Sequence, residues 1–461
     1  MNFRIKNVVV LGSGVMGSGI ACQLANVGLK VLMLDILPQG QAQKNKSNRN
    51  SVAQDALTKA IKSKPAPLYK KEYASRITVG NFEDDFEKIQ GADWIIEVVV
   101  ERLDIKQQIF EKVEQYRQKG SIVSSNTSSI PISQLSDGRS AEFKKHFCGT
   151  HFFNPPRYLR LLEIIPIPET QPELIDFFMH FGEINLGKQT VLCKDTPAFI
   201  ANRIGVMSGV KVFDLTQKYD LSIEEVDALT GSLIGRPNTG TFRLQDLVGL
   251  DTGEKVTQFV VNNVKNDSFF ESVGKAPETK FMTFLLENNF LGNKTGKGFY
   301  QKTNQKDEKG KTIINALNLK TLEYNPSLRP KNPILKEAKA IEKMQKRMSF
   351  LMGKEDKESL FLKEYFTAIF AYSAQRVPEI SDQYYPVDDA MRAGYVWDFG
   401  PFEYWDLIGF QNGLDMIEAA GESLPEWIGQ MKKAGADQFY KYEKGQKKYF
   451  NIQSQQYKTI P

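Results

Sequence analysis

The pattern of hydrophobic and polar positions predicts a parallel sheet in the N-terminal part of the chain and helices in the rest. Short runs rich in Val, Ile and Leu alternate there with segments whose apolar residues recur at helical spacing. Such alternation is typical of an α/β protein. The predicted strands cover residues 5–11, 31–35, 94–100, 121–124, 147–153 and 161–165, with a helix over 103–117.

The first predicted strand runs directly into Gly-Ser-Gly-Val-Met-Gly at residues 12–17, and a helical pattern follows. In this setting Gly12 permits a tight turn, Gly14 lets a pyrophosphate approach the backbone, and Gly17 allows close packing of helix on strand. Asp35 ends the second strand, where its carboxylate can accept both hydroxyls of an adenosine ribose, and no arginine follows to hold a 2′-phosphate. The pattern therefore indicates a site for NAD rather than NADP. A glycine turn that only packs is the alternative.

Among three histidines, His151 is the candidate catalytic base. It ends a predicted strand and precedes a rigid turn at residues 154–156, whereas His146 follows two lysines and His180 lies in a helical pattern. Glu163 sits within an apolar strand, where a carboxylate is costly unless it is paired. An imidazole on the neighbouring strand would pair it and fix the tautomer of the ring. A solvent-facing Glu163 on an edge strand is the alternative.

Four motifs occur in order, at residues 12–21, 125–129, 151–155 and 195–203. Together they resemble the L-3-hydroxyacyl-CoA dehydrogenases of fatty-acid β-oxidation, strongly from residue 8 to about residue 300. The resemblance implies an α/β Rossmann-type NAD-binding domain followed by an all-α helical domain. It also implies an acyl-CoA substrate that is oxidised at its 3-hydroxyl group with NAD⁺.

In that family a histidine removes the hydroxyl proton while C3 gives its hydride to the nicotinamide. His151 matches that base and Glu163 its paired acid. The residues that match substrate-holding positions are Ser128, Asn154 and Asn202. The implied cofactor contacts are Gly12, Gly14, Val15, Met16, Gly17, Asp35, Glu101 and Lys106, although Arg102 stands where many members have Asn.

Charge is distributed unevenly along this chain of net charge +5. Residues 44–76 hold nine Lys or Arg against two acidic residues, and residues 301–357 hold fourteen against seven. Two separate basic stretches on an acidic body do not fit a nucleic-acid binder. The resemblance implies that the first stretch, within a helical insertion at about 38–76, contacts CoA through Ser51 and Lys59. A merely solvated helical hairpin is the alternative.

The second half of the chain repeats itself. Residues 240–253 recur at 400–413 with six of fourteen positions identical, which predicts a duplicated helical domain. The expected domains are residues 1–193, residues 194–300 as the first helical copy, a linker over 301–357, and residues 358–461 as the second copy. A helix is expected to begin at Pro197. We expect the second copy to cover the surface through which single-copy relatives dimerise, which favours a monomer.

Composition sets the remaining expectations. With 41% hydrophobic and 25% charged residues, no apolar run of membrane-spanning length and three scattered cysteines, we expect a metal-free cytoplasmic protein with no membrane segment. An enoyl-CoA hydratase domain or partner is a further expectation from the resemblance. The alternatives are a 3-hydroxybutyryl-CoA dehydrogenase working in the reductive direction, a hydroxyacid dehydrogenase of the 3-hydroxyisobutyrate type, which uses a lysine, and a non-catalytic protein that binds NAD or CoA.

Overall fold

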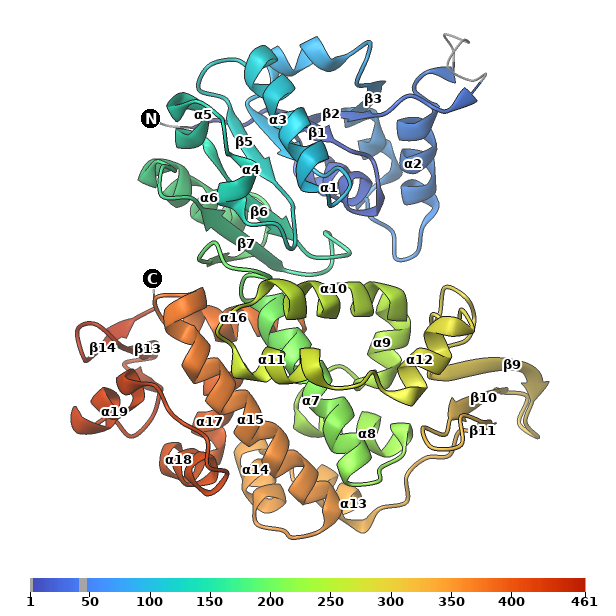
Figure 1. The fold of residues 1–461 in the computed structure, drawn as a ribbon, viewed down its shortest axis with the longest axis vertical. Helices are drawn as coiled ribbons and strands as arrows, with labels where there is room; N and C mark the ends of the chain where they lie inside the picture. The colour runs from blue at the N-terminus through green and yellow to red at the C-terminus, as the bar shows by residue number, and fades with distance from the viewer. Residues whose placement is uncertain (1–2, 41–47, 461) are drawn as a thin grey trace. The chain divides into compact units, whose positions relative to one another are not determined.

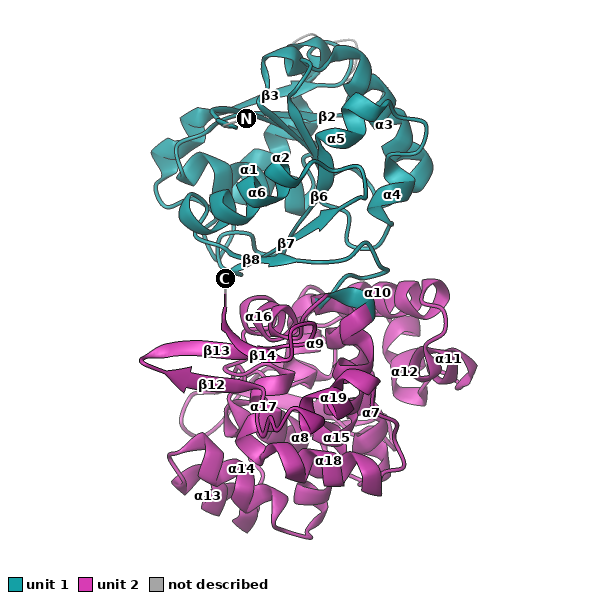
Figure 2. Cartoon of the chain, turned by 90° about the vertical axis from the view of Figure 1, so that its left-hand side faces the viewer, with its two compact units in different colours: residues 1–200, 379–381 teal, residues 201–378, 382–461 magenta. Residues whose placement is uncertain are grey.

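The computed structural model describes residues 3–40 and 48–460, which form two compact units (Figure 2). Unit 1 comprises residues 1–200 and 379–381, and unit 2 comprises residues 201–378 and 382–461. The expected boundary between residues 193 and 194 thus lies a few residues before the observed change of unit. In the described part of the chain, none of the helices is both long and apolar enough to cross a membrane.

Unit 1 is built on one eight-stranded sheet in the order β3-β2-β1-β4-β5-β6-β7-β8 (Figure 1). Neighbouring strands are parallel except β6 and β7, which run antiparallel. Most strand residues are buried, as is usual for a mainly parallel sheet. The strands are β1 (Asn7–Leu11), β2 (Lys30–Asp35), β3 (Ile77–Asn81), β4 (Trp94–Glu97), β5 (Ile122–Ser125), β6 (Phe147–Phe152), β7 (Leu161–Pro166) and β8 (Gln189–Leu192).

Six of these strands confirm the predicted ones, and β3 and β8 are additional. Both additional strands lie at the edges of the sheet, are short, and contain Gly, Thr, Asn or Gln, so their apolar signal is weak. The strand order reverses at β1, which pairs with β2 on one side and β4 on the other. Ligands of such sheets bind at the carboxyl ends of the strands beside this reversal.

Helices connect the strands of unit 1. Helix α1 packs on β1, β2 and β3, and α6 packs on β7 and β8. The predicted helix over 103–117 is confirmed as α3. The helices are α1 (Val15–Asn26), α3 (Leu103–Tyr116), α4 (Ile132–Leu135), α5 (Ala141–Lys145), α6 (Pro172–Ile184) and the 3₁₀ helix η4 (Phe86–Gly91).

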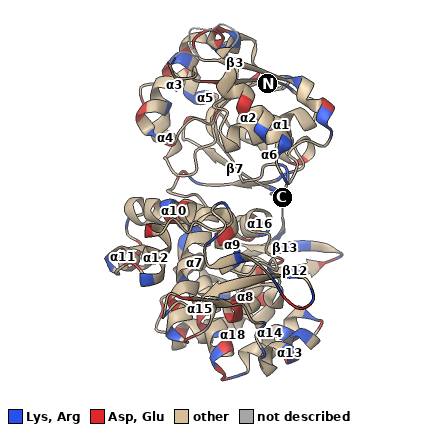
Figure 3. Cartoon of the chain, turned by 90° about the vertical axis from the view of Figure 1, so that its right-hand side faces the viewer, with Lys and Arg blue, Asp and Glu red and all other residues tan. Residues whose placement is uncertain are grey.

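The basic insertion between β2 and β3 is helical, as predicted, although residues 41–47 lie outside the described part. It contains α2 (Ser51–Lys62) and the 3₁₀ helix η3 (Lys71–Arg76). Helix α2 packs on α1, β2 and β3. Its last turn carries Lys59 and Lys62, and Figure 3 shows where Lys and Arg lie along this helix. We call residues 48–76 of this insertion the basic arm.

Unit 2 is mainly helical. The expectation that its first helix begins at Pro197 is wrong, because Ala198 and Phe199 have left-handed φ values of 65° and 51°. The helix therefore begins at Ala201. The helices are α7 (Ala201–Lys218), α8 (Ile223–Thr230), η5 (Ser232–Ile234), α9 (Phe242–Val248), α10 (Leu250–Asn263), α11 (Ser268–Lys275), α12 (Lys280–Glu287), α13 (Pro333–Ala340), α14 (Met344–Met352), α15 (Lys357–Ile380), α16 (Tyr385–Gly394), α17 (Pro401–Ile408), α18 (Phe410–Ala419) and α19 (Glu426–Lys433).

Residues 301–357, expected to be a linker with some helix, form more structure than that. They contain a three-stranded antiparallel sheet of β9 (Tyr300–Lys306), β10 (Thr312–Leu317) and β11 (Tyr324–Pro326), followed by α13 and α14. Helix α14 packs on α17, and β10 contacts α8. The segment is therefore part of unit 2. A second small sheet, β12 (Tyr440–Glu443), β13 (Gln446–Asn451) and β14 (Gln456–Thr459), ends the chain.

Two buried aspartates organise the first half of unit 2. Asp227 accepts hydrogen bonds from the backbone N–H of Phe242 at 2.6 Å and the hydroxyl of Tyr300 at 2.7 Å. Asp246 accepts the backbone N–H groups of Phe299 and Tyr300, both at 2.8 Å. We call this arrangement the aspartate–tyrosine latch. It ties α8 and α9 to the start of β9.

The second half of unit 2 contains the same arrangement. Asp388 accepts the backbone N–H of Phe402 at 2.9 Å and the hydroxyl of Tyr440 at 2.6 Å. Asp406 accepts the backbone N–H groups of Phe439 at 2.7 Å and Tyr440 at 2.8 Å. Each bond has its counterpart in the first half, between residues of the same type. On this support we propose that the two halves are copies of one helical domain.

Burial makes the latch sensitive to pH. It raises the pKa of Asp227 to about 7. The folded state therefore binds the proton more tightly than the unfolded state, so the stability that this proton contributes is lost as pH rises through about 7. We expect the Asp227→Asn variant to show a smaller fall in unfolding temperature between pH 5 and pH 8 than the wild type, as measured by circular dichroism. The exposed Asp415→Asn change is the control and should keep the wild-type pH dependence.

Candidate active site

The glycine loop follows β1 at the point where the strand order reverses. Gly12 has φ of +105°, and a Cβ placed on it would lie 2.6 Å from the carbonyl oxygen of Val98. A Cβ on Gly17 would lie 1.9 Å from the carbonyl oxygen of Gly12. Both positions therefore require glycine. A Cβ on Gly14 would meet nothing within 4 Å, so the backbone there is open to an approaching group.

Asp35 lies at the end of β2, directly beside this loop. Its Oδ2 accepts hydrogen bonds from the backbone N–H of Ser13 at 2.6 Å and the hydroxyl of Ser13 at 2.5 Å, and its Oδ1 accepts the N–H of Ile36 at 2.7 Å. The carboxylate retains lone pairs for further donors. A ribose diol supplies such donors, whereas a phosphate at this point would meet a negative charge. The residues present thus fit NAD.

A cavity of about 670 Å³ joins the glycine loop to two other parts of unit 1. Its walls include Gly14, Val15 and Asp35, the α2 residue Lys59, and the turn that follows β6, residues 154–157. Val15 is largely exposed, and Met16 beside it is half-buried. The structure thus brings predicted cofactor residues, one predicted CoA contact and Asn154 to a single cavity. Ser51 is the first residue of α2 and is not among the residues that line it.

His151 and Glu163 face each other across the antiparallel pair β6 and β7. The Nδ1 of His151 lies 2.7 Å from Oε2 of Glu163. Glu163 is fully buried and His151 is 5% exposed. The alternative of an edge-strand Glu163 facing solvent is wrong, because β8 covers the other side of β7. The predicted pairing is therefore present.

Further contacts hold both members of this pair. The Oε1 of Glu163 accepts the backbone N–H of Ile200 at 3.2 Å. Burial, and then the charge of Glu163, raise the pKa of the Cys193 thiol well above its usual value. The rings of Phe153 and Phe199 lie against His151, with centroids at 4.6 and 5.6 Å. The imidazole is thus oriented by a carboxylate on one side and aromatic rings on others.

Glu101 organises the turn that carries Ser128. Its Oε1 accepts the hydroxyls of Thr127 at 2.5 Å and Ser129 at 2.6 Å, and the backbone N–H of Ser128 at 3.1 Å. Its Oε2 lies 3.1 Å from the ammonium of Lys106. Burial acts to raise the pKa of Glu101, but Lys106 and the hydroxyl donors outweigh it and lower the pKa below the usual value. Glu101 is therefore an anion at neutral pH.

Lys106 lies beneath this turn in a buried network. Its ammonium is 2.6 Å from Oε1 of Glu97 and 3.3 Å from the carbonyl oxygen of Val99, and its side chain is 1% exposed. Glu97 also accepts the hydroxyl of Ser125, and burial raises the pKa of Glu97 above its usual value. Lys106 thus helps to hold Glu101 through their ion pair. That Lys106 contacts the cofactor stays a prediction. Sequence reasoning missed Glu97, although an acid in an apolar strand is the signal that identified Glu163.

The remaining predicted residues lie as follows. Asn154 is exposed at the start of the turn after β6, and Asn126 ties the Ser128 turn to β6 by accepting the N–H of Phe152 at 2.8 Å. Asn202 lies in α7 of unit 2, and its role stays a prediction. His146 and His180 have no part in this arrangement: His146 Nδ1 lies 2.9 Å from a backbone carbonyl oxygen, and His180 is exposed on α6.

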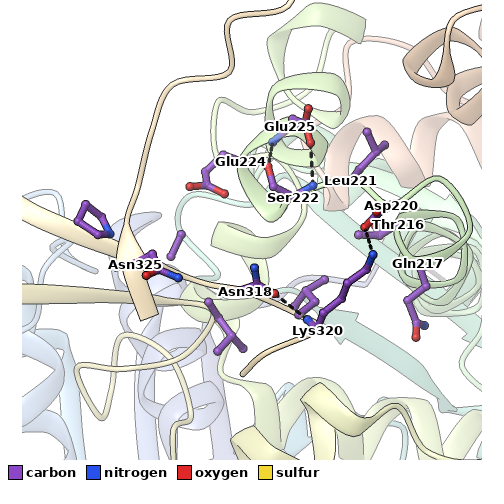
Figure 4. A pocket seen from close by; sticks show the side chains of 14 residues that line it. Thr216, Gln217, Asp220, Leu221, Ser222, Glu224, Glu225, Asn318, Lys320 and Asn325 are labelled. Carbon is purple, nitrogen blue, oxygen red and sulfur yellow. Dashed lines mark hydrogen bonds and ion pairs between the residues drawn. The ribbon is translucent and has the colours of Figure 1, made fainter. Parts of the chain in front are cut away.

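Another cavity, of about 520 Å³, lies within unit 2 between the ends of α7 and α8 and the β10–β11 connection (Figure 4). Its polar groups are engaged with one another: Ser222 and Glu225 cap α8, and Lys320 pairs with Asp220 at 2.7 Å. Histidine and cysteine are not among its lining residues. Its side chains offer no base with an oriented partner, in contrast to those around His151.

The sheet topology, the glycine loop at the strand reversal and Asp35 at the end of β2 define a Rossmann-type dinucleotide-binding protein. Comparison with family models matches residues 7–196 to the NAD-binding domain of 3-hydroxyacyl-CoA dehydrogenase and residues 199–302 to its C-terminal domain. The chain belongs to the 3-hydroxyacyl-CoA dehydrogenase family. This confirms the resemblance seen in the sequence and the NAD-binding domain.

Individual relatives agree with this assignment. The chain is 44% identical over 460 residues to a probable 3-hydroxyacyl-CoA dehydrogenase of Bacillus subtilis, covering 98% of this chain and 57% of that protein. It is 42% identical to a probable 3-hydroxyacyl-CoA dehydrogenase of Deinococcus radiodurans, covering 69% of this chain and 89% of that one. The crystal structure of 3-hydroxybutyryl-CoA dehydrogenase from Escherichia coli has the same fold, with a TM-score of 0.66, 22% identity and coverage of 93% of this chain and 98% of that one. The chain therefore spans little more than half of the Bacillus relative.

The Glu97–Lys106 pair makes a testable contribution to this site. Removing one member of a buried ion pair leaves an uncompensated charge, which costs about 3–5 kcal/mol. We expect the Lys106→Met variant to lose stability on that scale in urea unfolding followed by fluorescence. The double variant Glu97→Gln with Lys106→Met should recover much of the loss, because the fully buried charge of Glu97 is then removed as well. Equal stability of the single and double variants would contradict the pairing.

Proposed function

We propose that this protein oxidises L-3-hydroxyacyl-CoA to 3-ketoacyl-CoA with NAD⁺, as a step of fatty-acid oxidation. The observation that supports this most strongly is the buried His151–Glu163 pair on two strands of the sheet that also carries the NAD-binding loop. Removal of a hydroxyl proton needs a base that is active near neutral pH, and an oriented imidazole is such a base.

The geometry suggests how each residue acts. When His151 donates its Nδ1–H to Glu163, the Nε2 keeps its lone pair and can take the proton of the 3-hydroxyl group. Bound NAD⁺ supplies the acceptor for the hydride of C3. Ser128 and Asn154 are proposed to hold the substrate oxygen, with Asn202 contributing from α7. Glu101 positions Ser128 through the hydrogen bonds of its turn. Ser51 and Lys59 of α2 are proposed to contact the CoA moiety.

The same residues serve the reverse reaction, since His151 in its protonated form returns the proton to the ketone. Assays in both directions, with esters of several chain lengths, decide between fatty-acid oxidation and reduction of a short 3-ketoacyl-CoA. Confirmed NAD binding without turnover of any ester would point to a non-catalytic binding protein. That result would contradict the proposed function.

The location, the partner and the oligomeric state of the enzyme are also proposals. We propose a cytoplasmic protein, on the support of three free, buried cysteines. We propose that it acts with an enoyl-CoA hydratase, on the support of its 32% identity over 457 residues to a protein of Rickettsia felis named as a putative fatty acid oxidation complex trifunctional enzyme. A monomer is proposed because the second helical copy can occupy the surface that a partner subunit would cover, and light scattering of the intact chain tests this.

The His151→Gln variant is expected to lose activity. Loss of a general base typically lowers the rate by about 10²–10⁴-fold, and glutamine cannot accept the proton. NADH formation from 3-hydroxybutyryl-CoA measures the effect, and calorimetry should show that NAD still binds. The exposed His180→Gln variant is the matched control and should keep wild-type activity. Full activity of His151→Gln would exclude His151 as the base.

Glu163→Gln tests the acid separately from the base. Glutamine can still accept from the imidazole, but it does not stabilise the positive charge that the ring gains. We therefore expect kcat to fall about 10-fold or more with a smaller change in KM. Steady-state kinetics with 3-hydroxybutyryl-CoA is the measurement. An unaltered kcat would mean that Glu163 serves only packing.

A further inference from the structure

The turn at residues 153–160, which connects β6 to β7 and carries Asn154, is bonded to the basic arm. The Nη1 of Arg157 donates hydrogen bonds to the carbonyl oxygens of Ala66 at 2.7 Å and Leu68 at 2.9 Å. The hydroxyl of Tyr158 donates to the same oxygen of Ala66 at 3.0 Å. Three hydrogen bonds therefore reach one short stretch of the arm.

That stretch, residues 65–69, has no helix or strand of its own. It is held from α1 by Asn26, which donates to the carbonyl oxygen of Pro67 at 2.9 Å and accepts the N–H of Tyr69 at 2.8 Å. The guanidinium carbon of Arg157 lies 4.6 Å from the ring centroid of Tyr69. Without Arg157, the stretch would be tied on the α1 side but lose its main link to the turn.

The turn itself is firmly placed. The ammonium of Lys188, which is 4% exposed, donates to the carbonyl oxygens of Pro156 and Leu159, the latter at 2.7 Å. On the other side, a Cβ on Gly19 of α1 would lie 3.0 Å from Pro156, so the turn packs closely on the helix that follows the glycine loop. Arg157 therefore connects a segment without regular secondary structure to a firmly placed turn.

The two segments form facing parts of one cavity wall. The cavity beside the glycine loop is lined by Pro65 and Pro67 of the arm, by Asn154 and Pro156 of the turn, and by Arg157 between them. The arm also contributes Lys59 and Lys64 to this cavity. The hydrogen bonds of Arg157 thus help to fix the distance between the cationic side chains of the arm and the turn.

We propose that Arg157 is a positioning residue that holds residues 65–69 of the arm against the Asn154 turn, so that the arm is ordered before the phosphate-bearing end of an acyl-CoA arrives. This inference rests on the proposed function. Ordering a segment in advance removes an entropic cost from binding. The acyl end of the substrate does not benefit, so the gain is specific to substrates that carry the complete CoA moiety.

Two substrates separate this role from general damage to the site: acetoacetyl-CoA and the acetoacetyl thioester of N-acetylcysteamine, which lacks the phosphates and adenosine. For Arg157→Ala we expect the ratio of their kcat/KM values to fall about tenfold, roughly the worth of a charge-assisted hydrogen bond. Arg160→Ala, which removes the same charge from the same turn, is the matched control and should keep the ratio.

Titration calorimetry with CoA alone gives a readout that does not require turnover. The affinity of Arg157→Ala for CoA should fall by a similar factor, while its affinity for NAD should fall less. A wild-type ratio in Arg157→Ala would overturn the proposal, because the hydrogen bonds of Arg157 would then not be needed. An equal loss for NAD and CoA would also overturn it. Wild-type enzyme that binds CoA but turns over neither thioester would contradict the proposed function and leave the calorimetric comparison to decide the role of Arg157.

Discussion

The buried carboxylate of Glu163 is the constraint on which the β6–β7 part of the sheet in unit 1 depends. A fully buried carboxylate is costly unless donors surround it. Here the antiparallel register of β6 and β7 places His151 directly opposite, and the backbone N–H of Ile200 reaches the other oxygen. A shift of that register by one residue would point His151 to the other face of the sheet and leave the carboxylate without it. The His151–Glu163 pair therefore stabilises the buried carboxylate between β6 and β7, and the same pair orients the proposed base.

The neighbouring part of the sheet uses the same principle with a different purpose. Glu97 at the end of β4 is neutralised by Lys106, and Lys106 in turn pairs with Glu101. Glu101 then accepts hydrogen bonds from the turn that carries Ser128. A chain of alternating charges thus runs from the fully buried end of β4 to the turn that carries the half-buried Ser128. The position of Ser128, which we propose to hold the substrate oxygen, is set in this way by groups that need not touch the substrate.

Sequence reasoning reached those features that have a local chemical signature. The sequence alone shows glycines with fixed spacing, an acid at a strand end and an acid within an apolar run. Gly12, Asp35 and Glu163 lie as expected from these features. The start of α7 could not be predicted, because Ala198 and Phe199 adopt left-handed conformations that usually require glycine. Strands β8, β9 and β11 were missed because they are rich in polar residues. The Arg157 contacts join segments about 90 residues apart and leave no trace in spacing.

The latches of unit 2 bear on the origin of the second half of the chain. Burial raises the pKa of Asp227 and of Asp406 to about 7, so each position costs stability when it is ionised. In each half, two aspartates receive the same kinds of donors from a Phe-Tyr pair and from the start of the following helix. Independent arrival at two such costly arrangements, in the same order along the chain, requires many coincident choices of residue. Duplication requires one event, and together with the repeat at residues 240–253 and 400–413 it is the simpler account.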